Sequence, residues 1–419
     1  MIADPRAFLE DLFFEAVRAA DPYEAICANL PARPKGRTIV IGAGKAASQM
    51  AEAFERAWPH PYEGVVVARH GPVAPCRIIK ILQSAHPVPD EAGLAASEAL
   101  IRTVHGLTKD DLVIALISGG GSALLPAPPE GFSLADEIAL NQALLASGAP
   151  ISAMNLVRKH FSRIKGGRLA DLAHPARVVS LIVSDVPGDN PAFVASGPTV
   201  PDEGDAADAL RAIRDYKIAL PERVIDHIHQ VVTPEPSEAS FANNEVHVIA
   251  SARVSLEAAA KLALERGVEP LILSDCIEGE AKDIGRMHAA LAKEFSSRTA
   301  AGKPIVLLSG GETTVSIGSG TYGKGGRNSE LLLSAALDLQ GSHGITALAA
   351  DTDGIDGSED NAGAFCDGQT VARIRASGGD ARSFLAGHDA WSAFAISGDL
   401  FAPGPTGTNV NDFRAFLLH

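Results

Sequence analysis

The sequence has few cysteines, no long apolar run and no excess of basic residues. Its four cysteines, Cys27, Cys76, Cys276 and Cys366, form no C-x-x-C pair and no pair at metal-ligand spacing, so we expect reduced thiols. No segment reaches the roughly 18 uninterrupted apolar residues of a membrane helix. The first residues lack the basic and apolar regions of a secretory signal. We therefore expect a cytoplasmic protein without a membrane partner.

Basic residues are scarce relative to acidic ones. The formal net charge of −15 argues against a nucleic-acid partner, because a phosphate backbone needs clustered lysine and arginine. Small anionic ligands remain compatible with this charge, since they need only local positive charge and backbone N–H groups. The chain has 419 residues, of which 46% are hydrophobic, and this combination predicts a globular protein of two domains.

Apolar strand-like runs alternate with helical patterns along the chain. This alternation predicts an α/β fold in which helices cover both faces of a parallel sheet. A stretch rich in proline and serine, residues 232–240, interrupts the pattern, so we expect one domain over residues 1–237 and a second over residues 238–419. The expected strands are 38–41, 64–68, 78–82, 111–117, 178–183, 245–250, 270–273, 304–309 and 346–350, and the expected helices include 8–20, 91–105 and 133–147.

The segment Val-Ile-Gly42-Ala-Gly44-Lys45-Ala-Ala joins the end of a strand, a glycine turn and the start of a helix. It fits the relaxed dinucleotide fingerprint G-x-G-x-x-A, and it fails the P-loop pattern. The next strand ends at Arg69 and lacks the acidic residue that holds a ribose hydroxyl. Three ligands therefore remain open: a dinucleotide with a 2′-phosphate, an ATP phosphate, or a small acid that meets Lys45 at the helix start.

Further polar loops follow expected strands in the first half. The run Ser-Gly-Gly-Gly-Ser at 118–122 predicts either a nest of N–H groups for an anion or a tight turn capped by serine. In Ser-Asp185-Val-Pro-Gly-Asp189, two carboxylates suit Mg²⁺ or proton transfer, and a simple Asx-type turn is the alternative. Lys165 ends a basic stretch before two glycines, where it either faces a cleft or lies on a solvated helix face.

The second half carries three polar loops. Ser-Gly-Gly-Glu312 repeats the strand–glycine pattern, and Gly-Lys324-Gly-Gly-Arg327 places two cations among glycines, as a polyphosphate site requires. The segment 351–357, Asp-Thr-Asp-Gly-Ile-Asp-Gly, has Ile355 where a calcium loop needs an oxygen ligand, so Mg²⁺ held with substrate phosphates is the remaining metal hypothesis. Near the C-terminus, Gly-Pro-Thr-Gly-Thr-Asn-Val-Asn-Asp offers hydroxyl and amide groups.

The motifs together favour phosphoryl transfer. Several glycine-rich anion loops, acidic clusters and isolated cations are what this chemistry needs, because it is catalysed mainly by positioning and by charge stabilisation. The sequence contains no H-x-x-x-H pattern and no G-x-S-x-G elbow, which argues against a zinc enzyme and against an acyl hydrolase.

In order along the chain, the motifs resemble those of the glycerate 2-kinases of the MOFRL type. They are SGGGSALLP, NLVRKHFSRIKGG, SDVPGD, SGGETT, GKGGRNSE, DTDGIDGS and GPTGTNVND, and the match runs from about Gly42 to Asp412. The resemblance implies ATP-dependent phosphorylation of D-glycerate to 2-phosphoglycerate, with ATP and Mg²⁺ or another divalent cation as cofactors. It also implies a larger Rossmann-like N-terminal domain, a smaller α/β C-terminal domain and an active-site cleft between them, in a monomer or homodimer.

Position by position, the resemblance places Lys45, Arg327 and Asn409 in the family's active site, and it matches residues 118–122, Asp185, Asp189, Glu312 and Asp351 to the family's motif loops. One of Asp185, Asp189 and Asp351 is expected to hold Mg²⁺, and another to orient the 2-hydroxyl. The expected catalytic residues are Lys45, Arg327, Asp189 and Asn409. The expected metal ligands are Asp185, Asp351 and Asp353. The expected substrate- and nucleotide-binding residues are Gly44, Ser118, Gly119, Gly120, Gly121, Ser122, Lys165, Ser309, Gly310, Gly311, Glu312 and Thr408. One departure is Ser329, where the family pattern G-R-N-Q-E has glutamine.

Within this hypothesis, Lys45 neutralises the glycerate carboxylate or the transferring phosphoryl group, and Arg327 stabilises charge in the transition state. The triple-glycine loop cradles the ATP phosphates. Two rivals remain. Some family members are named hydroxypyruvate reductases, which agrees with the fingerprint at Gly42 and suggests an NADP-dependent reductase. A non-catalytic sensor of sugar acids is the second rival.

Overall fold

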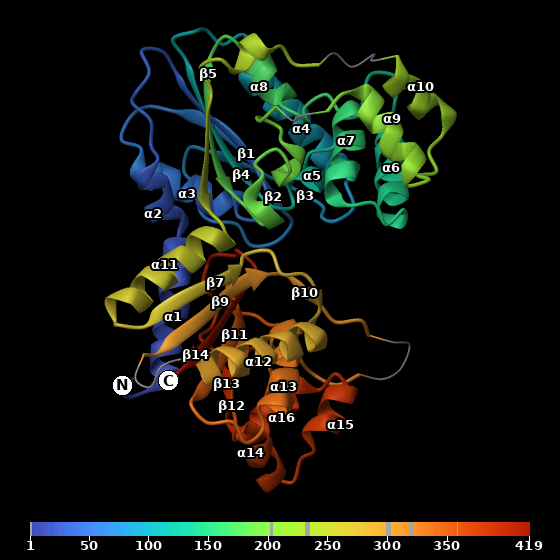
Figure 1. The fold of residues 1–419 in the computed structure, drawn as a ribbon. Coiled ribbons are helices and arrows are strands. Elements are labelled where there is room, and N and C mark those ends of the chain that lie inside the picture. The colour runs from blue at the N-terminus through green and yellow to red at the C-terminus, as the bar shows by residue number, and fades with distance from the viewer. Residues whose placement is uncertain (1, 202–203, 231–234, 299–302, 318–321, 358) are drawn as a thin grey trace. The chain divides into compact units, whose positions relative to one another are not determined.

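The computed structural model describes residues 2–201, 204–230, 235–298, 303–317, 322–357 and 359–419 (Figure 1). The chain divides into two compact units, each of which is considered by itself. The N-terminal unit comprises Pro22–Ile249, and the C-terminal unit comprises Met1–Asp21 together with Ala250–His419. Among the described residues, no helix combines the length and apolar character that crossing a membrane requires.

The N-terminal unit is built on a six-stranded sheet. Its strands are β1 (Thr38–Ala43), β2 (Glu63–Arg69), β3 (Lys80–Ser84), β4 (Leu112–Ser118), β5 (Arg177–Val183) and β6 (Glu245–Ala250). They lie in the order β3-β2-β1-β4-β5-β6, and the strands from β3 to β5 pair in parallel. The chain order reverses between β1 and β4, so their carboxyl ends flank the switch point at which open α/β sheets bind ligands.

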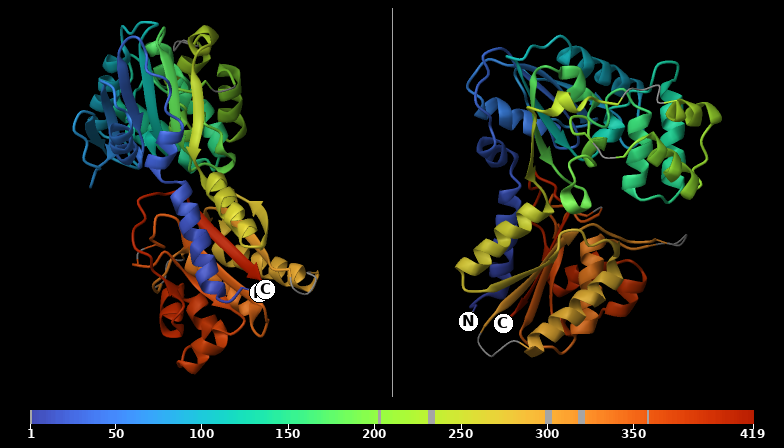
Figure 2. Two further views of the ribbon diagram at one scale, coloured as in Figure 1. Left: turned by 90° about the vertical axis from the view of Figure 1, so that its left-hand side faces the viewer. Right: turned by 45° about the horizontal axis from the view of Figure 1, so that its top comes forward.

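Helices cover both faces of this sheet (Figures 1 and 2). The helices of this unit are α2 (Pro22–Ala28), α3 (Ala47–Ala57), α4 (Glu91–Val104), α5 (Gly121–Leu124), α6 (Leu134–Ala146), α7 (Ile151–His160), α8 (Arg168–Ala173), α9 (Ala206–Asp215) and α10 (Glu222–His229), with 3-10 turns at Pro187–Asp189, Val194–Ser196 and Glu238–Phe241. Helices α4 and α8 pack on the face that carries Ile41, Ile117 and Ile182. Helices α6, α7, α9 and α10 enclose a small core of their own.

The C-terminal unit holds a mixed six-stranded sheet. Its strands are β7 (Glu269–Ser274), β9 (Ile305–Gly311), β11 (Ile345–Asp351), β12 (Gly363–Asp367), β13 (Leu400–Phe401) and β14 (Asp412–Leu418), and β8 (Gly279–Glu280) pairs separately with β10 (Thr313–Thr314). The order is β13-β12-β11-β14-β9-β7, in which β7 and β9 are parallel and the other pairs are antiparallel.

Two helical layers enclose the mixed sheet. The helices are α1 (Pro5–Ala19), α11 (Ala252–Glu265), α12 (Ala281–Arg298), α13 (Arg327–Leu339), α14 (Thr370–Ala376), α15 (Ala381–Ala386) and α16 (Ala390–Ser397). Side chains alternate along each strand, so Leu308 packs with α1 and α11 while its neighbour Leu307 packs with α12 and α13. The α/β fold class expected from the sequence is confirmed.

Most expected elements are present, and the differences concentrate in the C-terminal sheet. Every expected strand overlaps an observed one, namely β1 to β7, β9 and β11, and the expected helices overlap α1, α4 and α6. The expected strands include none over residues 363–367, where Gly363–Asp367 form β12. The alternation pattern also gave no sign of β14, which inserts antiparallel between β9 and β11.

The units differ from the expected division between residues 237 and 238. Helix α1 packs on α11 and on the C-terminal sheet, and Ser255 Oγ donates to Ala16 O at 2.8 Å, so the first residues belong to the C-terminal unit. Strand β6 neighbours β5, which extends the N-terminal unit to Ile249. Of the proline- and serine-rich stretch, residues 232–234 lie outside the described residues.

Candidate active site

In the N-terminal unit, the loops that follow β1 and β4 interlock. Lys45 N donates to Gly119 O at 2.8 Å, and Ala46 N donates to Ser118 Oγ at 3.0 Å. Gly44 has φ +140°, and a Cβ added there would lie 2.1 Å from Ser118 Oγ. Glycine is therefore required at position 44 by both conformation and space. The result is that the exposed Lys45 side chain stands beside the triple-glycine loop.

The triple-glycine loop fits closely against two neighbouring segments. A Cβ added to Gly119 would lie 1.7 Å from Asp185 Oδ2, and one added to Gly121 would lie 2.5 Å from Ala195 Cβ. Asp185 follows β5 and is half-buried. The structure thus brings Lys45, the triple-glycine loop and Asp185 together at the carboxyl ends of three adjacent parallel strands.

Ser122 is connected to a strained turn that the sequence analysis did not single out. Its hydroxyl lies 2.7 Å from Ser196 Oγ, and Ser196 Oγ donates to the buried Asn155 Oδ1 at 3.0 Å. Ala195 and Ser196 have φ of +54° and +59°, a region that residues with side chains rarely occupy. Gly166 N donates to Ser196 O at 3.0 Å and helps to hold the turn. This turn supports one side of the triple-glycine loop.

The remaining expected residues of this unit have different surroundings. Asp189 is half-buried in the turn Pro187–Asp189, with φ +53° and its N–H donating to Val186 O at 3.2 Å. Lys165 is only 2% exposed, and its Nζ donates to Glu137 Oε1 at 2.6 Å. The second oxygen of Glu137 accepts a hydrogen bond from Ala127 N at 2.9 Å. The surroundings of Lys165 therefore favour a structural role over the expected ligand contact.

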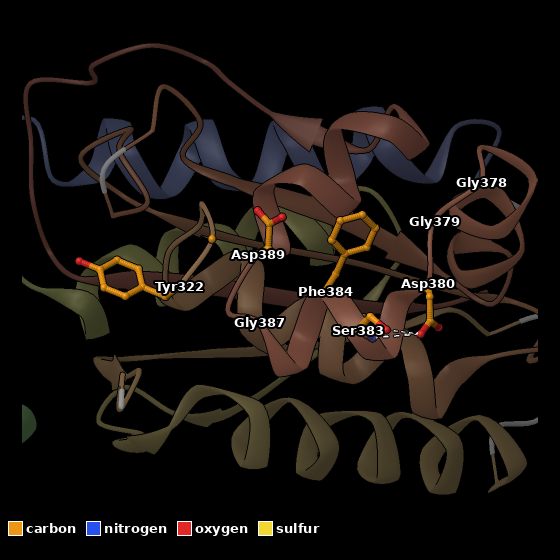
Figure 3. A pocket seen from close by; sticks show the side chains of 9 residues that line it. Tyr322, Gly378, Gly379, Asp380, Ser383, Phe384, Gly387 and Asp389 are labelled. Carbon is orange, nitrogen blue, oxygen red and sulfur yellow. Dashed lines mark hydrogen bonds between the residues drawn. The ribbon is translucent and has the colours of Figure 1, made fainter. Parts of the chain in front are cut away.

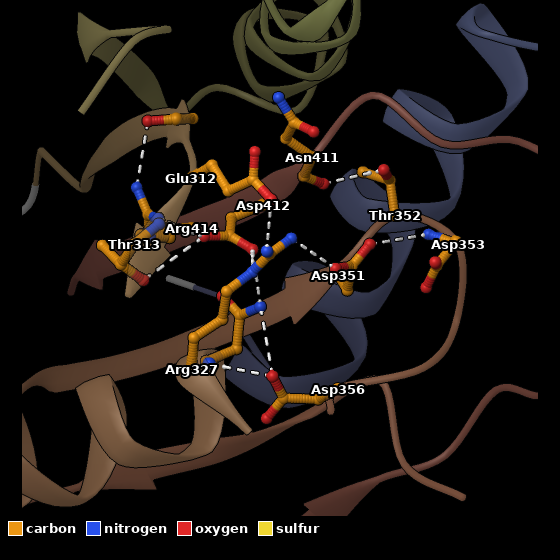
Figure 4. A network of polar contacts seen from close by, with 12 residues as sticks. Glu312, Thr313, Arg327, Asp351, Thr352, Asp353, Asp356, Asn411, Asp412 and Arg414 are labelled. Atoms are coloured by element: carbon orange, nitrogen blue, oxygen red, sulfur yellow. Dashed lines mark hydrogen bonds and ion pairs between the residues drawn. The ribbon is translucent and has the colours of Figure 1, made fainter. Parts of the chain in front are cut away.

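In the C-terminal unit, Arg327 is the centre of a carboxylate cluster (Figure 4). Its Nε donates to Asp412 Oδ1 at 2.7 Å, NH1 to Glu312 Oε1 at 2.6 Å and NH2 to Asp351 Oδ2 at 2.7 Å. Burial alone would lower the pKa of Arg327, but the three carboxylates outweigh burial and raise it. The guanidinium is permanently charged and fixed in orientation by these three partners, and the Arg327 side chain is 23% exposed.

Asp412 is a functional candidate that the sequence analysis did not name. It is the first residue of β14, and its side chain is fully buried. Besides Arg327, it accepts hydrogen bonds from Asn328 Nδ2 at 2.8 Å and Thr313 N at 3.2 Å, and it pairs with the buried Arg414. The motif Asn-Val-Asn-Asp contained this residue, but only the pairing of β14 with β9 and β11 shows that it anchors Arg327.

Asp356 fixes the start of helix α13, whose first residue is Arg327. Its carboxylate accepts from Asn328 N at 2.9 Å, Ser329 N at 2.8 Å and Ser329 Oγ at 2.6 Å, which satisfies N–H groups that a helix start leaves open. Burial raises the pKa of Asp356 to about 6, although these hydrogen bonds oppose the rise. Ser329, which replaces the expected glutamine, is buried and also accepts from Asn361 Nδ2 at 3.1 Å. The serine at position 329 is therefore hydrogen-bonded within the unit, to Asp356 and Asn361.

The acidic loop after β11 places Asp351 and Asp353 side by side. Asp353 N donates to Asp351 Oδ1 at 3.1 Å, and the exposed Asn409 donates from Nδ2 to Asp353 Oδ2 at 3.3 Å. Burial raises the pKa of Asp351 to about 8; Asp353 and Asp412 act in the same direction, and Arg327 opposes them. Thr408 is buried, and its hydroxyl donates to Ala20 O at 2.9 Å.

The expected metal ligands are divided between the units, Asp185 in one and Asp351 with Asp353 in the other. Within the part of the chain that the structure describes, no group of three or more histidine, cysteine, aspartate or glutamate side chains is arranged to hold a metal ion. Any metal bound by these carboxylates therefore needs additional ligands from a substrate or from water.

The second glycine motif, residues 309–311, lies at the end of strand β9 rather than in a loop. Ser309 is buried, with its hydroxyl 2.7 Å from His288 Nε2. Gly311 has φ +114°, and a Cβ added there would lie 2.3 Å from Ile277 N. The serine and the second glycine of this motif thus have structural partners, whereas Glu312 directly after them contacts Arg327.

A separate pocket of about 450 Å³ lies beside the glycine-rich segment that contains Lys324 (Figure 3). Its walls include Tyr322, Phe384 and two aspartates. Asp380 accepts from Ser383 N at 3.2 Å, and Asp389 accepts from Lys324 N at 2.9 Å, so both carboxylates are engaged within the unit. The pocket therefore offers mainly shape and aromatic surface to a ligand.

Comparison with known proteins identifies the family. Residues 8–229 match a family described as "Domain of unknown function (DUF4147)", and residues 305–412 match the "MOFRL family". A "D-glycerate 2-kinase" of Thermotoga maritima is 40% identical over 408 residues, which are 96% of each chain. The chain belongs to the MOFRL-type glycerate 2-kinase family.

Other relatives are named either glycerate kinase or hydroxypyruvate reductase. The crystal structure of a glycerate kinase from Thermotoga maritima superposes with a TM-score of 0.89 at 38% identity and covers 99% of both chains. A protein of Agrobacterium vitis named "Putative hydroxypyruvate reductase" is 50% identical over 416 residues, which are 99% of this chain and 94% of that one. The resemblance inferred from the seven motifs is confirmed. One of these relatives carries the name of the alternative function, hydroxypyruvate reductase.

The structure of this family member explains the dinucleotide-like fingerprint by packing. A Cβ added to Gly42 would lie 2.3 Å from Leu116 O, and Gly44 is confined by Ser118. Both glycines are thus needed for β1 and its loop to approach β4. The next strand, β2, ends at the exposed Arg69, with no carboxylate for a ribose hydroxyl. The fingerprint in this kinase-family chain therefore needs no dinucleotide to explain it.

The buried pair of Lys165 and Glu137 leads to a stability prediction. Replacing Lys165 by methionine is expected to destabilise the protein by about 3 kcal/mol or more, because Glu137 is left buried without its cation. The melting midpoint should fall by roughly 6 °C or more. Thermal unfolding of Lys165→Met and of the double variant Lys165→Met/Glu137→Gln provides the measurement. The double variant should recover much of the loss, and an unchanged midpoint in the single variant would contradict the structural role.

Proposed function

We propose that this protein is a kinase that transfers a phosphoryl group from ATP to the 2-hydroxyl of D-glycerate and forms 2-phosphoglycerate. The observation that carries the proposal is the fixed guanidinium of Arg327, held by three carboxylates in a chain 40% identical to a D-glycerate 2-kinase. A preorganised cation of this kind stabilises charge that develops on transferring oxygens.

The N-terminal unit supplies an anion-binding edge in this proposal. Lys45 presents an exposed ammonium group from a backbone that is fixed by Gly119. The N–H groups of the triple-glycine loop are suited to phosphate oxygens, because glycines let a ligand approach the backbone closely. We assign Lys45 to the glycerate carboxylate or the transferring phosphoryl group, and the loop to the ATP phosphates.

Arg327 retains donors for a ligand although it already makes three ion pairs. A guanidinium has five N–H groups, and one N–H at each of its three nitrogens accounts for the hydrogen bonds to Asp412, Glu312 and Asp351. Two N–H groups remain for phosphoryl oxygens, and 23% of the side chain is exposed. The three carboxylates keep the guanidinium still, so little reorganisation is needed when charge develops.

The excess of carboxylates around Asp351 and Asp353 suits the binding of a divalent cation. Asp353 adjoins a cluster in which three carboxylates, Glu312, Asp412 and Asp351, outnumber the two arginines, Arg327 and Arg414. Burial is the main cause of the raised pKa of Asp351, and the negative charges of Asp353 and Asp412 add to it. Mg²⁺ commonly binds one or two carboxylates together with substrate phosphates. We propose Asp351 and Asp353 in the C-terminal unit, and Asp185 in the N-terminal unit, as candidate metal ligands; a bound divalent ion would neutralise phosphate charge. Asp189 is then the proposed partner of the glycerate hydroxyl, and Asn409 supports the loop through Asp353.

The decisive experiment combines purified protein with D-glycerate, ATP and Mg²⁺. ADP release would be followed, and the product identified by phosphorus NMR. We expect ADP in step with a 2-phosphoglycerate signal. A parallel reaction would contain hydroxypyruvate and NADPH. Loss of NADPH without ADP release would establish the reductase instead, and D-glycerate binding without either reaction would favour a sensor.

The finer cellular assignments are part of the same proposal. A kinase of a small sugar acid needs only ATP and its substrate as partners, so we propose a cytoplasmic enzyme that acts as a monomer or homodimer. Sedimentation of the purified protein with and without ATP would determine the oligomeric state.

A further inference from the structure

We propose that His86 is a further substrate-binding residue of this kinase and that, together with Lys45, it holds an oxyanion of the substrate over Gly120. The inference rests on the proposed function, because it deepens the role of the same anion-binding edge. The bound group is the glycerate carboxylate or a phosphate of ATP, which share this chemistry, and the test below separates the two.

The geometry at Gly120 places both side chains around one point. A Cβ added to Gly120 would lie 3.0 Å from Lys45 Cγ, 3.1 Å from Lys45 Cε and 3.2 Å from His86 Nε2. Gly120 itself has φ +79°, which favours glycine at this position. The methylene stem of Lys45 and the imidazole of His86 thus both lie against Gly120, at the place that a Cβ would crowd, so the two side chains are close to each other.

The segment that carries His86 is attached to the triple-glycine loop. It follows β3, whose last residue, Ser84, is buried and donates from Oγ to Leu124 O at 3.2 Å at the end of α5. Ser84 O also accepts from His70 N at 3.0 Å, which connects the ends of β2 and β3. His86 is therefore presented by a tethered segment at the carboxyl edge of the sheet, and its side chain is exposed.

The electrostatic surroundings support an anion at this point. Burial, Lys45 and Arg69 all lower the pKa of His86, so its imidazole is neutral near pH 7 and offers a single N–H donor. An anion bound beside it would offset the two cations and raise that pKa. The titratable groups on the neighbouring elements are Lys45 after β1, Arg69 and His70 at the end of β2, Asp90 before α4 and Asp185 after β5.

The kinetic test compares His86→Gln with wild type and with His70→Gln. His70 is also exposed and lies near the end of β2, but it pairs with Asp90 at 3.1 Å, so its variant serves as the matched control. We expect His86→Gln to raise KM about 10-fold for the substrate that it binds, with a smaller change in kcat. A rise confined to D-glycerate identifies the carboxylate, and a rise confined to ATP identifies a phosphate. Unchanged KM values for both substrates would overturn the proposal.

A second measurement does not depend on turnover. The His86 imidazole resonance, assigned by its absence in His86→Gln, would be titrated with pH in wild-type protein alone, with D-glycerate and with ATP. We expect one of the two ligands to raise its pKa by about one unit. If wild type lacks kinase activity but this shift occurs, the proposed function fails and the anion site stands. If wild type is active and neither the shift nor the KM change occurs, the role of His86 fails alone.

Discussion

Replacing Arg327 by alanine is expected to reduce kcat by about 10²–10³-fold, the loss that follows removal of one charge-stabilising donor. Arg327 makes three ion pairs but keeps two N–H groups for a ligand, so the variant loses both a ligand contact and the cation that three carboxylates surround. Steady-state kinetics of ADP release at saturating D-glycerate and ATP give the measurement.

Two variants distinguish the roles of charge and geometry at this position. Arg327→Lys keeps a positive charge but lacks the planar fork that meets Asp412, Glu312 and Asp351 together, so intermediate activity is expected. Arg253→Ala removes an arginine that pairs with Glu257 on the surface of the same unit and should behave as wild type. A kcat near the wild-type value in Arg327→Ala would show that Arg327 does not stabilise the transition state.

The Arg327 variant also has an expected pH signature in stability. The folded-state pKa of Asp351 is raised to about 8, so its contribution to stability is full below its unfolded pKa of about 4 and is lost as the pH rises towards 8. In Arg327→Ala the opposing cation is gone and this pKa rises further. Denaturant unfolding at pH 7 and pH 9 measures the free energy of unfolding. This free energy should keep falling above pH 8 in the variant and should level off in wild type. Parallel profiles would contradict this account.

In the N-terminal half of the candidate site, the sequence indicated which polar loops follow buried strands, because this information is local. Lys45, the triple-glycine loop and Asp185 each follow a buried strand directly. Parallel neighbours place their carboxyl ends along one edge, so the three segments meet without any long-range detail being known. Lys165 shows the limit of this reasoning: it lies in the turn before α8, and the local sequence gives no sign that its partner is Glu137 of α6.

In the C-terminal half of the candidate site, the surroundings of Arg327 are set by residues that are distant from it along the chain. Asp412 contacts Arg327 only because β14 inserts between β9 and β11, and a single seven-residue strand after a glycine-rich loop carried no pattern that specified this. Asp356 caps α13 from another loop, which helix-start signals in the local sequence do not show. Gly363 was also misleading, because a glycine weakens a strand pattern, whereas this one is needed in β12: an added Cβ would lie 1.9 Å from Ala349 O.

Replacing Lys45 by alanine is expected to lower kcat/KM by at least about 10²-fold with little change in stability, in contrast to Arg327→Ala. The backbone N–H of residue 45 would still donate to Gly119 O, so the loop keeps its shape, while the exposed ammonium is lost. Parallel measurements of ADP release and thermal unfolding separate the two effects.

Whether the loss of activity in Lys45→Ala appears in KM or in kcat shows which group Lys45 binds. If Lys45 binds the glycerate carboxylate equally in the ground and transition states, the loss lies in KM for D-glycerate; if it meets the transferring phosphoryl group, the loss lies in kcat. Lys80→Ala removes an exposed lysine of β3 and is the matched control, expected to match wild type. Full activity in Lys45→Ala would leave the glycine N–H groups as the anion site and would also remove the partner through which His86 was assigned.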